Sequence, residues 1–396
     1  MSTHRLAFVF PIIGNLTNAG ILKRELFLED RRHINTDSDS EILLNVFAHE
    51  LLKSNHLSLR PDDVFNAVQG VHKRCMGAYA AVMMIANLGI VAFRDRYGIR
   101  PLVYGVKETP EGLQYMVASE SVALDVLGYQ LVRDVAPGEA IYIDEKGQFH
   151  NQLCATESMH TPCIFEYVYF ARPDTIFEGQ VIHEVRQRLG RMLAREAPTA
   201  ADVVVGVPDS ATPAAIGYSL ESGIPFTEGL TKNRYIGRTF IQPDDQLRKE
   251  GVRIKYNPLE ANLKGKRVVL IDDSIVRGNT AGPLVQLIRD GGAKEVHVRV
   301  SSPPVTNPCF MGIDMATKKE LIGANAEIED IRQRIGADSL AYLSLAGMLE
   351  AVTAGIRQQT GHCAACFSGE YPIPIPEWLF RDERDQEKLV FEEMWG

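Results

Sequence analysis

The chain has 396 residues, 45% of them hydrophobic and 23% charged, with a formal net charge of −9. This length and composition are typical of a soluble globular protein of two or three domains. The acidic balance argues against general binding of nucleic acid, which usually requires a basic surface. No apolar run is long enough to cross a bilayer, so we expect a cytoplasmic protein with no membrane partner.

The first residues include an apolar stretch, 6–13, that follows His4 and Arg5. This order loosely resembles a secretory signal peptide. Pro11 interrupts the stretch, however, and no cleavage site of small residues follows it. We therefore do not expect a signal peptide here.

Residues 15–150 contain both helix and strand patterns. Ser38 followed by Glu41 has the spacing of a helix-capping box, and Pro61 stands where a second helix begins. Strand-like runs then follow at 78–86, 89–94, 102–105, 115–118 and 140–143. Helix pairs with many strands predict a layered α/β sandwich, and the polar stretch 146–161 is expected to be a linker.

The second half of the chain begins with an amphipathic helix predicted over 181–195. Three continuous apolar runs follow, at 203–207, 267–271 and 296–300, with a helix expected over 282–290. Fully apolar strands alternating with helices predict a parallel sheet that is covered on both faces. Ligands bind such sheets at the carboxyl ends of the strands, so the loops after these runs are candidate sites.

Residues 268–280, with the sequence VVLIDDSIVRGNT, predict a strand, a loop and the start of a helix. Asp272 and Asp273 fall at the end of the strand, and Gly278 allows the main chain to approach a ligand closely. Loop N–H groups and the positive helix end favour a phosphate, while the carboxylates suit ribose hydroxyls and Mg²⁺. An acidic pair alone would more simply cap a helix. The whole run resembles the motif with which type I phosphoribosyltransferases bind 5-phosphoribosyl-1-pyrophosphate (PRPP).

Two further segments have polar groups that could reach this site. Residues 207–212 (VPDSAT) follow an apolar run, where a pyrophosphate-binding loop or an ordinary strand-to-helix turn would lie. Residues 232–255 contain seven basic side chains against three acids: Lys232, Arg234, Arg238, Arg248, Lys249, Arg253 and Lys255. Such a run is either a solvated face or a flap that closes over a polyanion and excludes water.

Segments 166–174, 232–240 and 271–278 are together similar to the amidophosphoribosyltransferase family, which catalyses the first committed step of purine synthesis. The resemblance extends over most of the chain. It implies an α/β protein: a shortened glutaminase domain of the N-terminal-nucleophile type (an αββα sandwich) at 1–155, and a type I phosphoribosyltransferase domain with a parallel sheet at 156–396. Glutamine would be hydrolysed in the first domain. The ammonia would displace pyrophosphate from PRPP in the second and give 5-phosphoribosylamine.

The resemblance also assigns residues and partners. Mg²⁺ would be held near Ser210, Asp272 and Asp273. The residues expected to bind PRPP are Asp272, Asp273, Ser274, Arg277, Gly278, Thr280, Lys232 and Arg234. Purine nucleotides would act as feedback inhibitors, and the enzyme would be a homodimer or a homotetramer.

The six cysteines are Cys75, Cys154, Cys163, Cys309, Cys363 and Cys366. Cys363 and Cys366 form a CxxC pair, which alone is compatible with free thiols, with tetrahedral zinc or with an iron–sulfur cube. Members of the resembled family that contain an iron–sulfur cluster have cysteines in the sequence contexts that match Cys163, Cys309, Cys363 and Cys366. The resemblance therefore implies a [4Fe-4S] cluster on those four and leaves the first two as free thiols.

The beginning of the chain departs from the family pattern. Family members begin with a nucleophilic cysteine whose own amino group is the base, whereas this chain begins Met1-Ser2. A family segment with an oxyanion-hole asparagine aligns with residues 12–18, where Ile13 replaces the asparagine and Gly14 remains. Asp39 matches the family's ligand for the glutamine amine, or serves only the first turn of its helix. A misplaced start codon, an upstream frameshift or a genuinely shortened protein would each explain this departure. If the chain as given is the real product, we expect no glutaminase activity, with ammonia-dependent synthesis retained if the first domain folds.

Two other functions are compatible with parts of the pattern. A phosphoribosyltransferase for a nucleobase would share the PRPP loop but would not explain residues 15–150. A non-catalytic PRPP-binding regulator would be expected to have a basic helix-turn-helix, which the sequence does not show. Release of pyrophosphate from PRPP with ammonia would distinguish both from an amidotransferase.

Overall fold

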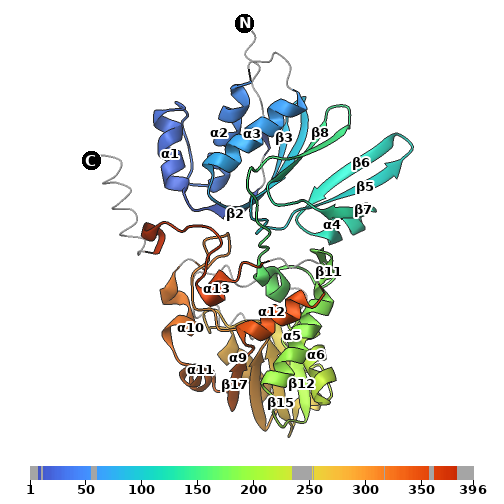
Figure 1. Ribbon diagram of the computed structural model, residues 1–396. Helices are drawn as coiled ribbons and strands as arrows, with labels where there is room; N and C mark the ends of the chain where they lie inside the picture. The colour runs from blue at the N-terminus through green and yellow to red at the C-terminus, as the bar shows by residue number, and fades with distance from the viewer. Residues whose placement is uncertain are drawn as a thin grey trace.

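The computed structural model describes residues 8–9, 12–54, 60–233, 252, 254–315, 317–355 and 361–380. Figure 1 shows two halves, with the N-terminal half (blue to green) above the C-terminal half (green to red). Among the described residues, no helix has the length and apolarity needed to cross a membrane.

The N-terminal half contains two antiparallel sheets with helices outside them. The larger sheet consists of β1 (Phe8–Val9), β2 (Ile12–Leu16), β3 (Gly77–Ile85), β4 (Gly89–Arg94), β8 (Glu139–Asp144) and β9 (Phe149–Leu153). The smaller sheet consists of β5 (Val103–Thr109), β6 (Gly112–Ala118) and β7 (Gln130–Asp134). The helices are α1 (Ala19–Leu28), α2 (Asp39–Leu52), α3 (Pro61–Arg74) and α4 (Ser121–Val126).

Two hydrophobic layers hold this half together. One lies between α1–α3 and the larger sheet, and includes Val46, Phe47 and Phe93. The other lies between the two sheets, where Ala92 and Tyr104 belong to the same apolar cluster. The order helix, sheet, sheet, helix is the αββα sandwich that the sequence predicts.

Two local predictions in this half are wrong. Ser38 does precede α2, but Glu41 accepts hydrogen bonds from the N–H groups of Asn35 and Thr36 (2.8 and 2.7 Å) and does not close a capping box with Ser38. The expected linker 146–161 contains β9, which pairs with β8. Its side chains are half-buried or exposed, so an edge strand there has no apolar pattern to reveal it.

The C-terminal half contains one four-stranded sheet and two two-stranded sheets. Its strands are β10 (Ile176–Phe177), β11 (Gln180–Val181), β12 (Val203–Gly206), β13 (Leu230–Lys232), β14 (Tyr256–Pro258), β15 (Arg267–Asp272), β16 (Glu295–Val300) and β17 (Ser339–Tyr342). Its longer helices are α5 (Ile182–Glu196), α6 (Thr212–Ser222), α9 (Ala281–Asp290), α11 (Ile328–Ile335) and α12 (Leu345–Thr353). Shorter turns are η1 (Glu166–Phe170, a π-helical turn), α8 (Glu260–Leu263), η2 (Lys318–Glu320), α10 (Ile322–Asn325), α13 (Ala365–Ser368) and η3 (Glu377–Phe380).

The four central strands are parallel, in the order β12-β15-β16-β17. All four residues of β12 are buried, as are the four central residues of β15. Successive side chains of a strand point to opposite faces, so both faces of this sheet are covered, as predicted. The carboxyl ends of the strands therefore form one edge, to which β12 and β15 bring the loops that begin at 207 and 273.

The two halves share a continuous contact. Ala78 and Ile99 of the N-terminal half belong to the same apolar cluster as the core of the C-terminal half. Arg94 also donates from Nη2 to Oε1 of Glu178 at 2.8 Å across the junction. The division of the chain between residues 155 and 156 remains a prediction.

Candidate active site

The carboxyl edge of the parallel sheet brings two acidic residues and a serine together. Asp272 is the last residue of β15, and its carbonyl accepts the N–H of Ser301 at 2.9 Å. The next carboxylate, Asp273, is in close contact with the hydroxyl of Ser210, which lies in the loop after β12. Ser274 also donates its hydroxyl to Asp273, at 2.9 Å. Two neighbouring parallel strands thus assemble the three residues that the sequence predicts for Mg²⁺.

Both carboxyls of this pair have a raised pKa. Burial raises the pKa of Asp272 well above its usual range, and the charge of Asp273 raises it further. Burial also raises the pKa of Asp273, although Ser210 and Ser274 lower it through their hydrogen bonds. Two buried like charges are stabilised by a cation or by hydrogen-bond donors. The pair is therefore suited to a ligand that supplies one of these.

The loop between β15 and α9 has a backbone that requires glycine at one position. Gly278 has a φ of +76°, and a Cβ there would lie 2.6 Å from Cδ1 of Ile322. Thr280 is the last residue before α9, and its carbonyl accepts the N–H of Leu284 at 3.1 Å. The first N–H groups of α9 thus lie at the end of this loop, where they favour an anion.

The guanidinium of Arg277 binds residues outside the loop between β15 and α9. Its Nε donates to Oε2 of Glu320 at 2.6 Å, and its Nη2 donates to the carbonyl of Asp314 at 3.2 Å. The guanidinium is therefore engaged with η2 and the segment before it. Its backbone still belongs to the loop.

The loop after β12 contacts β13 and β14, the two strands that flank the basic segment 232–255. Lys232, at the end of β13, forms an ion pair with Asp209. The hydroxyl of Tyr256, in the paired strand β14, donates to the carbonyl of Pro208 at 2.8 Å. The lysine that the sequence predicts for PRPP binding thus lies beside the Pro-Asp-Ser loop, whereas Arg234 lies outside the described residues.

Two residues near the acidic pair were missed by the sequence analysis. Tyr342 ends β17; burial raises the pKa of its phenol, and the charge of Asp272 raises it further. Among the described residues, its hydroxyl has no hydrogen-bond partner. The buried Arg186 of α5 is the second, and its charge lowers the pKa of Asp273 against the larger effect of burial. The parallel sheet could have suggested Tyr342, because each strand end lies on the same edge.

The predicted remnant of the glutamine site lies at the junction of the two halves. Asp39 accepts the N–H of Leu16 from β2 at 2.7 Å, and burial raises its pKa. Gly14 has a φ of +150°, and its backbone is so close to Gly312 that a Cβ on Gly312 would lie 2.8 Å from it. Ile13 is 41% exposed and has no polar atom in its side chain. Asp39 therefore joins its helix to β2, which is a structural role other than the helix-turn role that the sequence left open.

Four of the six cysteines gather in the C-terminal half. Cys163 and Cys363 lie in a parallel bridge, where Ile164 donates its N–H to the carbonyl of Cys363 at 3.1 Å. Burial raises the pKa of Cys366, and the charges of Cys163, Cys309 and Cys363 raise it further. The four predicted cysteines therefore lie in one region of the core, because Cys309 packs against the apolar cluster that contains the other three. None of the six cysteines is in a disulfide.

The two remaining cysteines are buried elsewhere. Cys75 directly follows α3, and Cys154 directly follows β9. Burial raises the pKa of each thiol to about 12. In the described part of the chain, no three or more His, Cys, Asp or Glu side chains are placed closely enough to hold a metal ion together.

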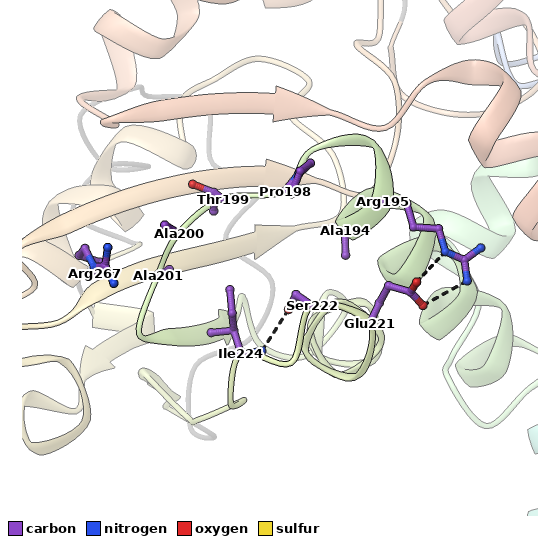
Figure 2. A pocket seen from close by; sticks show the side chains of 10 residues that line it. All are labelled: Ala194, Arg195, Pro198, Thr199, Ala200, Ala201, Glu221, Ser222, Ile224 and Arg267. Atoms are coloured by element: carbon purple, nitrogen blue, oxygen red, sulfur yellow. Dashed lines mark hydrogen bonds and ion pairs between the residues drawn. The ribbon is translucent and has the colours of Figure 1, made fainter.

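A cleft of about 430 Å³ lies at the opposite end of the parallel sheet (Figure 2). Arg267, the first residue of β15, lines it, and so does the ion pair between Arg195 and Glu221. Ligands of parallel sheets bind at the carboxyl ends of the strands, whereas this cleft is at the amino ends. We therefore assign the active site to the acidic pair and not to this cleft.

Comparison with known proteins identifies both halves. Residues 1–126 match the glutamine amidotransferase domain, and residues 175–302 match the phosphoribosyl transferase domain. The amidophosphoribosyltransferase of Pseudomonas aeruginosa is 49% identical over 363 residues, which are 90% of this chain and 72% of that protein. The protein of the same name from Escherichia coli is 48% identical over 347 residues, which are 86% of this chain and 69% of that protein.

A solved structure gives the same result. The glutamine PRPP amidotransferase of Bacillus subtilis matches with a TM-score of 0.82 and 42% identity, over 95% of this chain and 79% of that one. The match covers both halves, and the two matched domains occur in the order that the sequence predicts. The chain therefore belongs to the amidophosphoribosyltransferase family, whose members catalyse the first step of purine biosynthesis.

Proposed function

We propose that this amidophosphoribosyltransferase binds Mg²⁺-PRPP at the acidic pair and joins ammonia to C1 of the sugar. The nitrogen lone pair forms the bond to C1 as the bond between C1 and the pyrophosphate oxygen breaks, and that electron pair leaves with pyrophosphate. Loss of one proton from nitrogen gives 5-phosphoribosylamine. The domain that we place at residues 156–396 would carry out this step, for which ammonia supplied in solution is sufficient.

The acidic pair and its serine have distinct parts in this reaction. Asp272 and Asp273 accept hydrogen bonds from the ribose hydroxyls, and with Ser210 they hold Mg²⁺ through oxygen ligands. Bound Mg²⁺ supplies positive charge to the leaving pyrophosphate. The raised pKa of both Asp272 and Asp273 supports this fit, because the positive charge of a divalent cation would lower the pKa of each carboxyl.

The loop residues would hold the phosphate end of PRPP. Ser274 and Thr280 offer hydroxyls, and the glycine at 278 lets backbone N–H groups approach the phosphate. Arg277 contributes its backbone while its guanidinium is paired with Glu320. Lys232, and Arg234 beyond it, would neutralise pyrophosphate as it leaves.

The observation that carries this proposal is the contact between Ser210 and Asp273 across two neighbouring strands. We would measure pyrophosphate release from PRPP with ammonium salt and with glutamine, side by side. Asp273→Asn is expected to lower the ammonia-dependent rate by about 10²-fold or more, since it removes a charge aimed at the reacting sugar and metal. Asp202→Asn is the matched control, because Asp202 pairs with Arg267 at the opposite end of the same sheet. An Asp273→Asn variant with the unaltered rate would refute the proposal.

We further propose a [4Fe-4S] cluster on Cys163, Cys309, Cys363 and Cys366, in a structural or oxygen-sensing role. The support is that Cys163, Cys363 and Cys366 lie in one apolar cluster against which Cys309 packs, together with Arg100, whose charge lowers the pKa of Cys163 against the larger effects of burial and of Cys363. Cationic donors beside thiolate ligands are common around such clusters. Anaerobically purified protein should contain iron and acid-labile sulfide; zinc alone would overturn the assignment.

The remaining partners are also proposals. The Bacillus subtilis structure is a complex with ADP and GMP, and we infer that purine nucleotides inhibit this enzyme as well. Six free thiols suit a reducing compartment such as the cytoplasm, and we expect a homodimer or homotetramer. Inhibition of the ammonia reaction by the two nucleotides, and the particle mass from light scattering, would test these points. Neither a nucleobase phosphoribosyltransferase nor a non-catalytic regulator is favoured, because relatives of one activity cover most of the chain.

A further inference from the structure

The hairpin β10–β11 of the C-terminal half places one side chain against the N-terminal half. Its two-residue turn, Glu178 and Gly179, which we call the hairpin tip, has φ values of +50° and +74°. Figure 1 shows β11 at the boundary between the halves, next to α4 and β7. A left-handed backbone suits glycine and is unfavourable for glutamate, yet Glu178 is kept here with its side chain only 11% exposed. The contacts of its carboxylate therefore indicate what the hairpin tip does.

Two side chains hold the carboxylate of Glu178. Nη2 of Arg94 donates to Oε1 at 2.8 Å, and Nε2 of His160 lies 3.0 Å from Oε2. The buried Arg94 also donates to three main-chain carbonyls of the N-terminal half, at 2.7–2.8 Å. The N-terminal half thus fixes the guanidinium, and Glu178 supplies the negative charge that a buried guanidinium requires.

His160 is also held by the N-terminal half. The residues on either side of it donate their N–H groups to the carbonyls of Arg96 and Tyr97, at 3.0 and 2.8 Å. Its side chain is 28% exposed, so the imidazole can exchange protons with water. Histidine is the side chain best suited to gain a proton near neutral pH. A protonated His160 would place a second positive charge beside Glu178.

A second carboxyl group lies beside the hairpin tip. Asp134, the last residue of β7, accepts the N–H of Glu178 at 3.5 Å. Burial and then the charge of Glu178 raise the pKa of Asp134 to about 6, although Arg94 lowers it. Burial also raises the pKa of Glu178, but His160 and Arg94 together bring it below its ordinary value. Glu178 therefore keeps its negative charge at a pH where Asp134 gains a proton.

Two further titratable side chains lie near the hairpin tip in the C-terminal half. The ring of Tyr167 lies 5.0 Å from that of Phe177, and the ring of His362 lies 5.8 Å from that of Tyr167. Burial raises the pKa of Tyr167, and burial with the charge of His160 lowers the pKa of His362 to about 4. Both rings are therefore neutral between about pH 5.5 and pH 8. This leaves Asp134 and His160 as the described groups beside Glu178 that can change charge.

We propose that the hairpin tip is a proton-sensitive latch between the two halves, which tightens when Asp134 and His160 take up protons. A proton on Asp134 removes the repulsion between two neighbouring carboxylates. A proton on His160 turns its contact with Glu178 into an ion pair. Both changes favour the docked hairpin. The latch is independent of the chemistry proposed for the acidic pair.

The direction of the pH dependence follows from Asp134. Its pKa is raised in the docked state, in part by Glu178. Undocking moves Glu178 away and so lowers this pKa, which means that the docked state binds the proton more tightly. Docking is therefore strongest below about pH 6 and weakens as the pH rises through that value.

The test is hydrogen exchange of the full chain at several pH values between about 5.5 and 8. The rates are converted to protection factors, which removes the pH dependence of exchange itself. The N–H of Ile176 is the reporter, because it donates to Oγ of Ser121 across the junction at 2.8 Å. The N–H groups of β15 are the reference for global unfolding. Relative to them, protection of the reporter is expected to rise about 10-fold from pH 8 to pH 5.5, the equivalent of one pKa unit.

Two variants separate the contributions of the titrating groups. Asp134→Asn imitates the protonated carboxyl and should raise protection at pH 8 by a few-fold, which a merely structural role of Asp134 would not do. His160→Gln keeps a donor for Glu178 but gains no charge. It should lower protection at pH 5.5 and leave it within about twofold at pH 8. The double variant should have almost no pH dependence.

Thr175→Val is the matched control. Thr175 donates its hydroxyl to Oε2 of Glu120 at 2.7 Å, in a separate contact between the halves whose donor does not titrate. This variant should lower protection by the same factor at every pH and keep the slope of the unaltered chain. Protection that does not depend on pH in the unaltered chain would overturn the proposal, and so would a slope that persists in the double variant. If the double variant does not fold, an unaltered slope in both single variants has the same meaning.

Discussion

Each half has a carboxylate and a glycine near the end of a strand, and the two halves use them for different purposes. In the N-terminal half, Asp39 accepts the N–H of Leu16 at 2.7 Å, and Gly14 accommodates a close backbone contact. In the C-terminal half, Asp272 and Asp273 lie at the carboxyl edge of a parallel sheet with a raised pKa. Asp39 joins β2 to α2, whereas Asp272 and Asp273 could offer their negative charge to a cation or a hydrogen-bond donor of a ligand.

The difference follows from the kind of sheet. β2 is paired in an antiparallel sheet and leads into α1, with the start of α2 beside it, so polar groups there compensate main-chain groups. All four strands of the parallel sheet end on one edge, and each loop adds polar groups to the same place. Substitutions in the first region should therefore alter stability, and substitutions in the second should alter PRPP chemistry.

Apart from Asp273→Asn, the largest effect is expected at Gly278. Gly278→Ala places a Cβ 2.6 Å from Cδ1 of Ile322 and retains a φ of +76°, so the loop or that methyl group must shift. We expect a fall of about 10-fold or more in ammonia-dependent pyrophosphate release, because displacement of positioning groups is costly to catalysis. Gly336→Ala is the control: Gly336 has a φ of +74° and open space around its Cβ position. Both variants should lose about 1 kcal/mol of stability, and equal activities would contradict the comparison.

An acid-dependent loss of stability is expected in the N-terminal half. Burial lowers the pKa of His72 to about 4, from an ordinary value of 6.5. The unfolded chain therefore takes up the proton first as the pH falls. Stability should decrease between about pH 6.5 and pH 4, by up to about 3 kcal/mol from this residue.

Urea unfolding at several pH values between 7.5 and 4.5 would measure this loss. His72→Gln keeps a polar partner for the hydroxyl of Tyr79, which lies 2.9 Å from Nδ1 of His72. That variant should have a weaker dependence of unfolding free energy on pH. The same dependence in both proteins would mean that another group is responsible.

The smallest effect is expected at Asp39. Asp39→Ala leaves the N–H of Leu16 without its acceptor and should lower the free energy of unfolding by about 1–2 kcal/mol. The ammonia-dependent rate should not change. Asp37→Ala is the control, because Asp37 is exposed and forms a surface ion pair with Lys23, worth about 0–1 kcal/mol. A lower rate for folded Asp39→Ala would break the distinction between the two regions.

The sequence was most informative where apolar residues are continuous. The runs at 203–207, 267–271 and 296–300 correspond to β12, β15 and β16, and the acidic pair lies where the strand was expected to end. β17 was missed because its four residues, Ser339–Tyr342, are half-buried and do not form a long apolar run. Tyr342 was therefore missed with it.

Tertiary partners account for the other failures. Arg186 lies in an amphipathic helix where an arginine is expected to be exposed, yet it is 2% exposed and donates to η1. Arg277 belongs to a recognisable motif, but only the fold brings Glu320 to it. A periodic pattern indicates which face of an element is apolar. It does not indicate which distant main-chain carbonyl or carboxylate will compensate a charge.

The arrangement of the cysteine set has a consequence for the order of biosynthesis. Cys163 precedes η1, Cys309 follows β16, and the last two cysteines lie beyond α12. On the ribosome, the set is incomplete until α13 has been translated and the parallel strands before it have folded. Loading of the proposed cluster would therefore be a late event, and a loaded site would mark chains whose C-terminal half has been completed.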